Sequence, residues 1–296
     1  MDELTLAVLI TCHNRRDATV KCLQRLFEQS ALGSYKIRIY VVDDGSSDGT
    51  HEAVLNNFPD VRVLQGDGNL YWTGGMRLAW EAALKEDYDY YLWLNDDTEL
   101  YAGALNVLLQ TASEVRQLEG RDAIIVGSTS DPDTGEPTYG GVVRLQHVFS
   151  VGFRRMLPAD RPQQCDTMNG NCVLIPMEVV RKVGNLSPDF THGLGDYDYG
   201  LRAKQNGFSC WVAPGCIGTC KRNSTAGAWF DPELSLQKRI TKLNSPKGLP
   251  PKEWLIFVKR HGGRLHKMIA WLKLNLRLLF PRVWRKLQNI RTSDIQ

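Results

Sequence analysis

The sequence predicts an α/β fold, a sheet of mainly parallel strands with helices on both faces. In the first 130 residues, short apolar stretches of strand length alternate with stretches whose apolar residues recur at helical spacing. The apolar stretches are nearly continuous, as in strands that are buried on both faces, and such alternation implies crossover helices. With 296 residues, 43% of them hydrophobic, the chain is long enough for one large domain and a small appendage.

Each element follows from its own pattern. Predicted strands cover residues 4–11, 37–42, 61–64, 90–94 and 123–126, and predicted helices cover 17–29, 50–56, 75–85 and 101–115. Between residues 127 and 175 the composition favours loops and antiparallel strands, and 195–206 is helical again. A linker rich in proline and glycine follows Asn244. We therefore expect one domain over residues 1–245 and a helical C-terminal extension over 246–296.

The extension differs from the rest of the chain in charge. Residues 252–291 contain eleven Lys or Arg and one acid, so the remainder is acidic although the total net charge is only +3. Apolar residues are interleaved with these basic residues, which suits a helix lying in an anionic membrane interface. The alternative is that the apolar residues pack on the larger domain or on a second subunit, in a homo-oligomer.

Cysteine usage and the N-terminus indicate the compartment. Seven cysteines, an odd and scattered set, do not form the framework of a secreted disulfide protein. No apolar run approaches the roughly 18 residues of a membrane span, and the N-terminus lacks the basic flank of a signal peptide. We expect a cytoplasmic protein with reduced thiols and no nucleic-acid partner, held peripherally at the inner face of the cytoplasmic membrane by its basic tail.

Polar segments follow four successive predicted strands. They are TCHNRR at 11–16, DDGSSDGT at 43–50, GNLYWTGGMR at 68–77 and NDDT at 95–98. One such segment is weak evidence, because Asp, Gly and Ser also form turns and helix caps. Four at successive strand ends indicate a ligand site, since α/β sheets bind ligands beyond the carboxyl ends of their strands.

Together with HGLGDYDYGLRAKQNGF at 192–208, these segments resemble glycosyltransferases of family 2 from about residue 4 to residue 223. The resemblance implies the GT-A fold, a Rossmann-like mixed sheet with helices on both faces. GNLYWTGGMR and GDYDYGLRA are most similar to bacterial transferases of surface polysaccharides such as O-antigen, including rhamnosyl and galactofuranosyl enzymes. The implied reaction is an inverting transfer from a nucleotide-sugar donor, a dTDP- or UDP-sugar, to a polyprenyl-linked or growing glycan acceptor.

The resemblance assigns the nucleotide to the first two polar segments. An aspartate at the position of Asp44 hydrogen-bonds the nucleobase, while Thr11 and Arg15 line the same pocket. A carboxylate accepts hydrogen bonds from the N–H groups of a base, which fits a pyrimidine edge. The alternative is that residues 43–50 only cap the following helix.

The third polar segment is expected to bind the rest of the donor. Gly74 and Gly75 are predicted to open a helix, whose first backbone N–H groups favour an anion. Arg77 is placed to meet a phosphate or a sugar, and Asn69 belongs to the same predicted binding set. Trp72 is a candidate to stack on a sugar face, although aromatic residues of a loop also fold back onto cores.

NDDT corresponds to the metal-binding DxD of the family. A divalent cation, Mg²⁺ or Mn²⁺, held by carboxylate oxygens neutralises a diphosphate leaving group. Asn95 replaces the first acid, Asp97 aligns with the metal ligand, and Asp96 supports the ribose or the cation's surroundings. Many relatives add a histidine after the last strand of the sheet. Here the corresponding residues are GTCKRN, where Lys221 or Arg222 is an alternative source of positive charge.

The general base is assigned to the GlyAspTyrAsp segment. Asp196 aligns with the residue that takes the proton from the attacking acceptor hydroxyl, and Asp198 with an acid that supports the loop. Gly195 stands where the family usually has Glu. His192 is a candidate contact to the acceptor or a phosphate. The alternative for the two acids is a helix N-terminus that carries negative charge for its dipole.

Two other functions remain open. Because Asn95 and Gly195 replace acids, the chain is alternatively a catalytically inactive, sugar-nucleotide-binding partner in a membrane-associated glycan assembly complex. A sugar nucleotidyltransferase shares the architecture, but its glycine-rich, lysine-containing loop is missing from residues 11–15. The presence of Asp44, Asp97 and Asp196 together favours a glycosyltransferase.

Overall fold

The computed structural model describes residues 3–30, 35–147, 150–222 and 228–284. The chain divides into two compact units, the first made of residues 1–144 and 153–222, the second of residues 145–152 and 223–296. The linker expected after residue 245 lies inside the second unit, which therefore contains more than the C-terminal helix. All seven cysteines are free thiols, as predicted.

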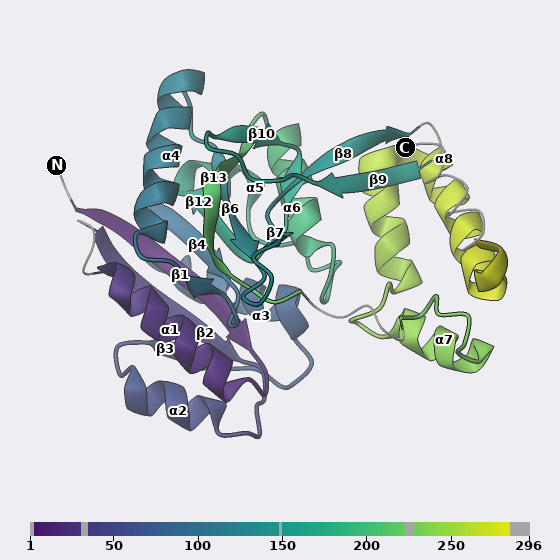
Figure 1. The fold of residues 1–296 in the computed structure, drawn as a ribbon, viewed down its shortest axis with the longest axis horizontal. Helices are drawn as coiled ribbons and strands as arrows, with labels where there is room; N and C mark the ends of the chain where they lie inside the picture. The colour runs from purple at the N-terminus through teal and green to yellow at the C-terminus, as the bar shows by residue number, and fades with distance from the viewer. Residues whose placement is uncertain (1–2, 31–34, 148–149, 223–227, 285–296) are drawn as a thin grey trace. The chain divides into compact units, whose positions relative to one another are not determined.

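The first unit is built on a mixed sheet, drawn in Figure 1, whose strand order is β10-β13-β6-β12-β4-β1-β2-β3, with β5 beside β13 and β7 beside β6. The strands are β1 (Leu4–Cys12), β2 (Tyr35–Asp43), β3 (Arg62–Gln65), β4 (Tyr90–Leu94), β5 (Glu99–Leu100), β6 (Ile124–Ser130), β7 (Pro137–Tyr139), β10 (Gln163–Cys165), β12 (Cys172–Pro176) and β13 (Cys210–Thr219). β4, β1, β2 and β3 are parallel, whereas β12 runs antiparallel to both β4 and β6. The sheet is therefore mixed, as the sequence implied.

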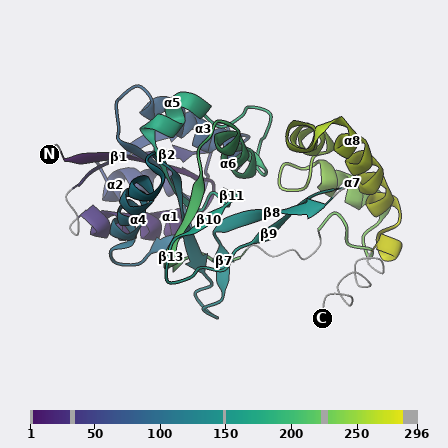
Figure 2. The same ribbon diagram turned by 90° about the horizontal axis from the view of Figure 1, so that it is seen from above.

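Helices cover both faces of this sheet, and Figure 2 shows the layers edge-on. One face carries α1 (Arg16–Ser30), α2 (Thr50–Asn57) and α4 (Ala104–Glu119); the other carries α3 (Tyr71–Ala83), α5 (Met177–Val183) and α6 (Gly195–Gln205). Successive side chains of a strand point to opposite faces. In β1, Leu6 and Val8 accordingly join the first core and Ala7 and Leu9 the second, which explains its unbroken apolar sequence.

The start of α3 corrects one prediction. The helix begins at Tyr71, not at Gly75, because the backbone N–H of Tyr71 donates to a carboxylate oxygen of Asp44 at 2.9 Å. Gly75 lies inside the helix, where a Cβ atom would stand 2.0 Å from the hydroxyl oxygen of Thr11. Glycine at this position therefore lets α3 approach β1 closely.

The second unit is mainly helical. It contains α7 (Leu236–Asn244), α8 (Pro251–Leu279) and the tip of a hairpin formed by β8 (Gly141–His147) and β9 (Ser150–Arg155), which with β11 (Thr167–Met168) makes a small second sheet. Trp229, Leu243 and Leu274 form its buried core. At Gly263, with φ of 87°, the geometry of α8 is interrupted. Among the described helices, none combines the length and apolarity needed to cross a bilayer.

Candidate active site

Three polar segments meet at one edge of the first unit's sheet. β1, β2 and β4 run parallel, with Cys12 paired with Asp43, so the residues that follow these strands emerge on the same side. β12 runs the other way and therefore begins at this edge, where the backbone N–H of Asn95 donates to the carbonyl oxygen of Asn171 at 2.9 Å. The edge thus also gathers the residues just before β12, which the sequence did not indicate.

Asp44 ties the end of β2 to the start of α3. Its side chain is 3% exposed, and its two carboxylate oxygens accept hydrogen bonds from the backbone N–H groups of Gly68 at 2.8 Å and Tyr71 at 2.9 Å. A Cβ atom at Gly66 would lie 2.5 Å from the same carboxylate. Each carboxylate oxygen can accept a second hydrogen bond, and the nucleobase contact of Asp44 stays a prediction.

Arg15 forms ion pairs with the two aspartates of the fourth polar segment, Asp96 and Asp97. Its Nη1 is 3.2 Å from Oδ1 of Asp96 and also donates to Oδ2 of Asp97. Thr11, by contrast, turns its hydroxyl toward Gly75 of α3. The structure therefore brings Arg15 to the acids and packs Thr11 under the helix, while a role for either in a base pocket stays a prediction.

Asp96 and Asp97 have different surroundings. The side chain of Asp97 is 24% exposed, whereas Asp96 is buried and its Oδ2 has no hydrogen-bond partner. Burial raises the pKa of Asp96 to about 7, against the opposing positive charge of Arg15. One carboxylate thus faces the open side of the edge, and the other carries an unsatisfied buried oxygen.

Cys220 is a residue of this site that the sequence analysis missed. It follows β13 and is buried; its thiol donates to Oδ1 of Asp97 at 3.4 Å and accepts from the side-chain amide of Asn171 at 3.3 Å. The available signal was its position after the last strand of the sheet. Among the described residues, no group of three or more His, Cys, Asp or Glu side chains is arranged to hold a metal ion.

A chain of contacts joins this acidic segment to Asp196. Asn95 accepts a hydrogen bond from the indole N–H of Trp72 at 2.7 Å. The Trp72 ring packs edge-to-face on Trp93 and lies so close to Gly170 that a Cβ atom there would be 2.3 Å from it. Gly170 in turn donates its backbone N–H to Asp196 at 3.0 Å. Trp72 therefore positions both halves of the site.

Asp196 occupies the first turn of α6 and is partly buried. Its oxygens accept hydrogen bonds from the backbone N–H groups of Gly170 and, at 2.8 Å, Tyr197. Burial raises the pKa of Asp196 to about 6, although both hydrogen bonds favour the charged form. A carboxylate with such a pKa is ionised at neutral pH and is a stronger base than an ordinary Asp.

The neighbours of Asp196 hold α6 in place. Asp198 is fully buried and forms an ion pair with Arg202 at 2.8 Å. Arg202 also donates to the carbonyl oxygens of Val183, the last residue of α5, and of Asn185 just after it. A Cβ atom at Gly195 would lie 2.6 Å from the Thr73 hydroxyl oxygen. Glycine replaces the usual acid here because α6 begins against α3.

His192 and the α3 residues provide fewer free groups than expected. The carbonyl oxygen of His192 accepts from the Thr73 hydroxyl at 3.0 Å. Gly74 donates its N–H within the chain, to the carbonyl oxygens of Leu70 and Thr191. Arg77 lies one turn further along, with Nε 3.9 Å from a carboxylate oxygen of Glu81. Substrate contacts of His192, Gly74, Gly75 and Arg77 stay predictions.

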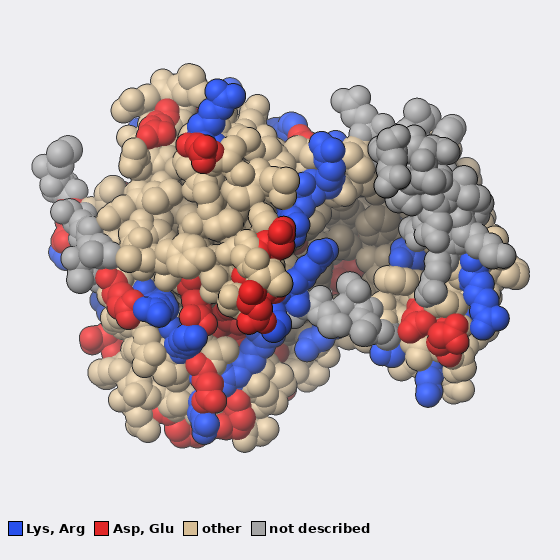
Figure 3. All heavy atoms as spheres, viewed as in Figure 1, with Lys and Arg blue, Asp and Glu red and all other residues tan. Residues whose placement is uncertain are grey.

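Two further expected contacts lie at the surface. Asn69 is exposed and donates to its neighbour Asp67, and Lys221 pairs with Asp133 while Arg222 is exposed. On the face of the first unit seen in Figure 3, basic side chains are interspersed with acidic ones. Substrate binding by Asn69, and phosphate binding by Lys221 or Arg222, stay predictions.

Comparison with known proteins gives one family. Residues 7–184 match the model of glycosyl transferase family 2. Over 214 residues the chain is 24% identical to the N-acetylglucosaminyl-diphospho-decaprenol L-rhamnosyltransferase of two Mycobacterium tuberculosis strains, covering 65% of this chain and 69% of the relative.

A solved structure shares the fold. A crystal structure of GalNAc-T7 with UDP, GalNAc and Mn²⁺ superposes with a TM-score of 0.56 at 16% identity, over 73% of this chain. This chain spans only 42% of that protein. The family match covers more than half of the chain. The chain therefore belongs to glycosyl transferase family 2 and is a glycosyltransferase with the GT-A fold.

Proposed function

We propose that the protein is an inverting transferase that moves a sugar, such as rhamnose, from a dTDP- or UDP-sugar to a polyprenyl-linked or growing bacterial surface glycan. The placement of Asp196 carries this proposal. Its carboxylate is held by two backbone N–H groups, has a raised pKa, and is joined through Gly170 and Trp72 to the segment of Asp96 and Asp97. A base and an acidic, phosphate-side segment on one sheet edge are what an in-line displacement requires.

In the proposed reaction, Asp196 accepts the proton of the acceptor hydroxyl. The hydroxyl oxygen forms its bond to the anomeric carbon of the donor sugar as the bond from that carbon to the diphosphate oxygen breaks. Negative charge collects on the departing nucleoside diphosphate. Arg15, which lies on the carboxylates of Asp96 and Asp97, is a positive group at this end of the site.

The residues present fit a divalent cation that the diphosphate helps to hold. Mg²⁺ takes one or two carboxylates and completes its shell with phosphate oxygens and water. Asp97 offers a partly exposed carboxylate, and the buried Oδ2 of Asp96 lacks a partner. A bound cation supplies charge neutralisation of the leaving group.

The cation proposal gives a prediction for Asp97. Asp97→Ala removes the accessible carboxylate, so donor binding that depends on added Mg²⁺ or Mn²⁺ is lost. Thermal shift with the donor nucleotide, with and without the cation, measures this. Asp133→Ala, which removes an exposed aspartate paired with Lys221, is the matched control. Full activity of the wild-type enzyme in excess chelator would contradict the proposal.

Membrane association at the cytoplasmic face is proposed from the second unit. On α8, Leu265, Met268, Leu272, Leu276 and Leu279 recur every three or four residues, each between 47 and 57% exposed. This spacing puts them on one helix face, which we call the apolar stripe of α8. An exposed stripe beside basic residues supports binding to an anionic bilayer, where a polyprenyl-linked acceptor resides.

One experiment separates this function from an inactive, sugar-nucleotide-binding partner. Purified protein is incubated with dTDP- and UDP-sugars, with Mg²⁺ or Mn²⁺, and with N-acetylglucosaminyl-diphospho-prenol as acceptor. Thermal shift reports binding of each donor by mass action, and chromatography reports glycan product and released nucleotide. Product with at least one donor supports the transferase. A donor-induced shift without product or donor hydrolysis supports the inactive partner.

A further inference from the structure

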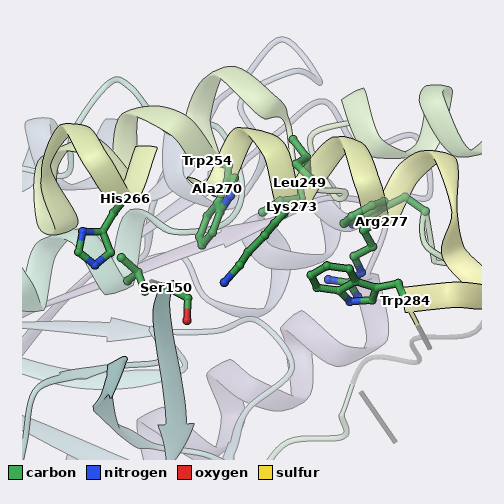
Figure 4. Close-up of a pocket in the computed structure, with 11 residues that line it drawn as sticks. Ser150, Leu249, Trp254, His266, Ala270, Lys273, Arg277 and Trp284 are labelled. Carbon is green, nitrogen blue, oxygen red and sulfur yellow. The ribbon is translucent and has the colours of Figure 1, made fainter. Parts of the chain in front are cut away.

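A pocket of about 150 Å³ is formed entirely by residues of the second unit. Figure 4 shows that α8 makes one wall and that Ser150, at the hairpin tip, lies opposite. Its lining combines aromatic, basic and aliphatic side chains: Trp229, Trp254 and Trp284; His266, Lys273 and Arg277; and Val151, Leu249, Ala270 and Leu274. No Asp or Glu is among these lining residues. The pocket therefore joins an apolar wall to positive charge.

The guanidinium of Arg277 is held in place by two aromatic rings and has an unpaired donor. The carbon at the centre of its guanidinium is 4.7 Å from the ring centroid of Trp229 and 4.0 Å from that of Phe230. These contacts use the flat faces of the group, whereas its N–H bonds lie in its plane. Its Nε is buried without a hydrogen-bond partner, and among the described residues no carboxylate acts on the Arg277 guanidinium. Burial also lowers its pKa.

A second unpaired donor lies beside it. The indole Nε1 of Trp284 is buried and has no hydrogen-bond partner among the described residues. Lys273, one turn from Arg277 on α8, points from the helix toward the hairpin tip in Figure 4. A buried donor without a hydrogen-bond partner is costly. A ligand with acceptor oxygens in this pocket would therefore bind favourably, because it would accept hydrogen bonds from these donors.

The size and the apolar wall limit what that ligand is. The pocket, at about 150 Å³, is too small for a long isoprenoid chain and admits only the anionic head of such a ligand with its first carbon atoms. Leu249 and Leu274 line the same small pocket as the basic side chains. A prenyl diphosphate places hydrocarbon immediately next to its phosphates, whereas a glycerophospholipid places a polar glycerol ester there. The pocket favours the prenyl diphosphate.

We propose that this pocket binds the diphosphate and the first isoprene unit of a prenyl diphosphate, the lipid part of the acceptor. The identification of the acceptor rests on the proposed function. Arg277 and Lys273 contact the phosphate oxygens, Trp284 donates its indole N–H, and the aliphatic wall covers the isoprene unit. The pocket uses a different face of α8 from the apolar stripe, because its helix residues are offset from the stripe by one or two positions.

Isothermal titration calorimetry of the full chain with geranyl diphosphate tests this proposal. We expect saturable binding, with inorganic pyrophosphate, geraniol and dihexanoyl phosphatidic acid each at least about tenfold weaker, since pyrophosphate lacks the hydrocarbon, geraniol lacks the phosphates, and phosphatidic acid places a polar glycerol ester where the pocket offers an apolar wall. Equal binding of pyrophosphate or of geraniol, or equal binding of phosphatidic acid, overturns the proposal.

Variants locate the binding. Arg277→Met and Lys273→Met should each weaken geranyl diphosphate about tenfold or more, as loss of a charged hydrogen-bond donor predicts. Lys267→Met, an exposed lysine of α8 outside the pocket, is the matched control and should bind like wild type. Lys273→Met keeps the test valid if Arg277→Met, which loses its stacking on Trp229, does not fold. Unchanged binding by a folded Lys273→Met variant overturns the proposal.

The donor assays separate the two proposals. Sugar transfer to a prenyl-linked acceptor without any binding of geranyl diphosphate overturns the pocket assignment and leaves the transferase intact. Binding that depends on Arg277 and Lys273, in a protein that forms no product with any donor, supports the pocket and contradicts the transferase.

Discussion

At the scale of one residue, the fold changes both the orientation and the pKa of the Asp196 carboxylate. Two backbone N–H groups fix its orientation, while burial moves its pKa upward to about 6. These effects oppose each other, because the hydrogen bonds favour the charged form and burial the neutral one. The result is a carboxylate that is charged at neutral pH yet more basic than one in water.

Replacing Asp196 tests its role as the base. Asp196→Asn keeps the size of the side chain but removes its proton affinity, so kcat for transfer should fall about a hundredfold or more. The donor-induced thermal shift should persist. Asp60→Asn, an exposed aspartate, is the matched control. Near-normal turnover by the Asp196 variant would remove this residue from the role.

The pH dependence follows from the same pKa. Only the ionised form of Asp196 accepts a proton, and its pKa of about 6 lies above the ordinary value. The rate of transfer should therefore rise with pH up to about 6 and level off above it, falling about tenfold per unit below. Rates measured from pH 4.5 to 8 under single-turnover conditions check this. A flat profile across pH 6 in a stable enzyme would contradict it.

At the scale of elements, glycines set how closely helices approach the site. α3 rests on β1 at Gly75 and Thr11, and α6 begins against α3 at Gly195 and Thr73. Both contacts leave no space for a Cβ atom. Gly75 thus has a packing role that the sequence did not indicate, and on the same helix Trp72 lies between Asn95 and Gly170. Anion binding by the start of α3 stays a prediction.

Gly75→Ala should destabilise the protein despite the better helix propensity of alanine. That propensity favours Ala by about 1 kcal/mol, but overpacking at a Cβ position 2.0 Å from the Thr11 hydroxyl costs about 1–3 kcal/mol. We expect a net loss of unfolding free energy, measured by denaturant titration. The matched control is Gly193→Ala, where an added Cβ meets no atom within 4 Å. A Gly75 variant as stable as the control would contradict this account.

At the scale of the whole molecule, the second unit adds a basic helix to the glycosyltransferase. Each basic group near an anionic surface contributes about 1 kcal/mol, and the apolar stripe of α8 is exposed. Full-length protein should therefore float with vesicles that contain anionic lipids and release in high salt. The double change Leu272→Glu and Leu276→Glu should reduce flotation at least about tenfold.

A substitution on the first unit provides the control for flotation. Leu118 of α4 is 71% exposed, so Leu118→Glu makes the same chemical change outside the stripe and should leave flotation unchanged. Point substitutions are sharper than truncation after Ser245, which would remove α8 and uncover the core around Trp229. Failure of the wild-type chain to float, with a change of oligomeric state in the double variant, would favour a second copy as the stripe's partner.

The sequence by itself determined the α/β class, the positions of most strands and helices, and the strand-end segments of the site. These follow from local patterns, because burial imposes periodicity on each element separately and turns require particular residues. The helical tail was found in this way, whereas the roles of Asp97 and Asp196 come from the resemblance to family 2 and stay predictions. α3 was placed too late because its start is set by Asp44, a residue 27 positions away in the chain.

Only the tertiary structure decided which residues meet. The antiparallel course of β12 between β4 and β6 brings Gly170 to Asp196 and Asn171 beside Cys220, and parallel packing of β1 and β4 brings Arg15 to Asp96. Likewise, the pattern of α8 showed that it was amphipathic, but not that one face would line a basic pocket while another stays exposed. Strand order and helix contacts depend on packing between segments that are distant in the chain. A local sequence pattern therefore does not predict them.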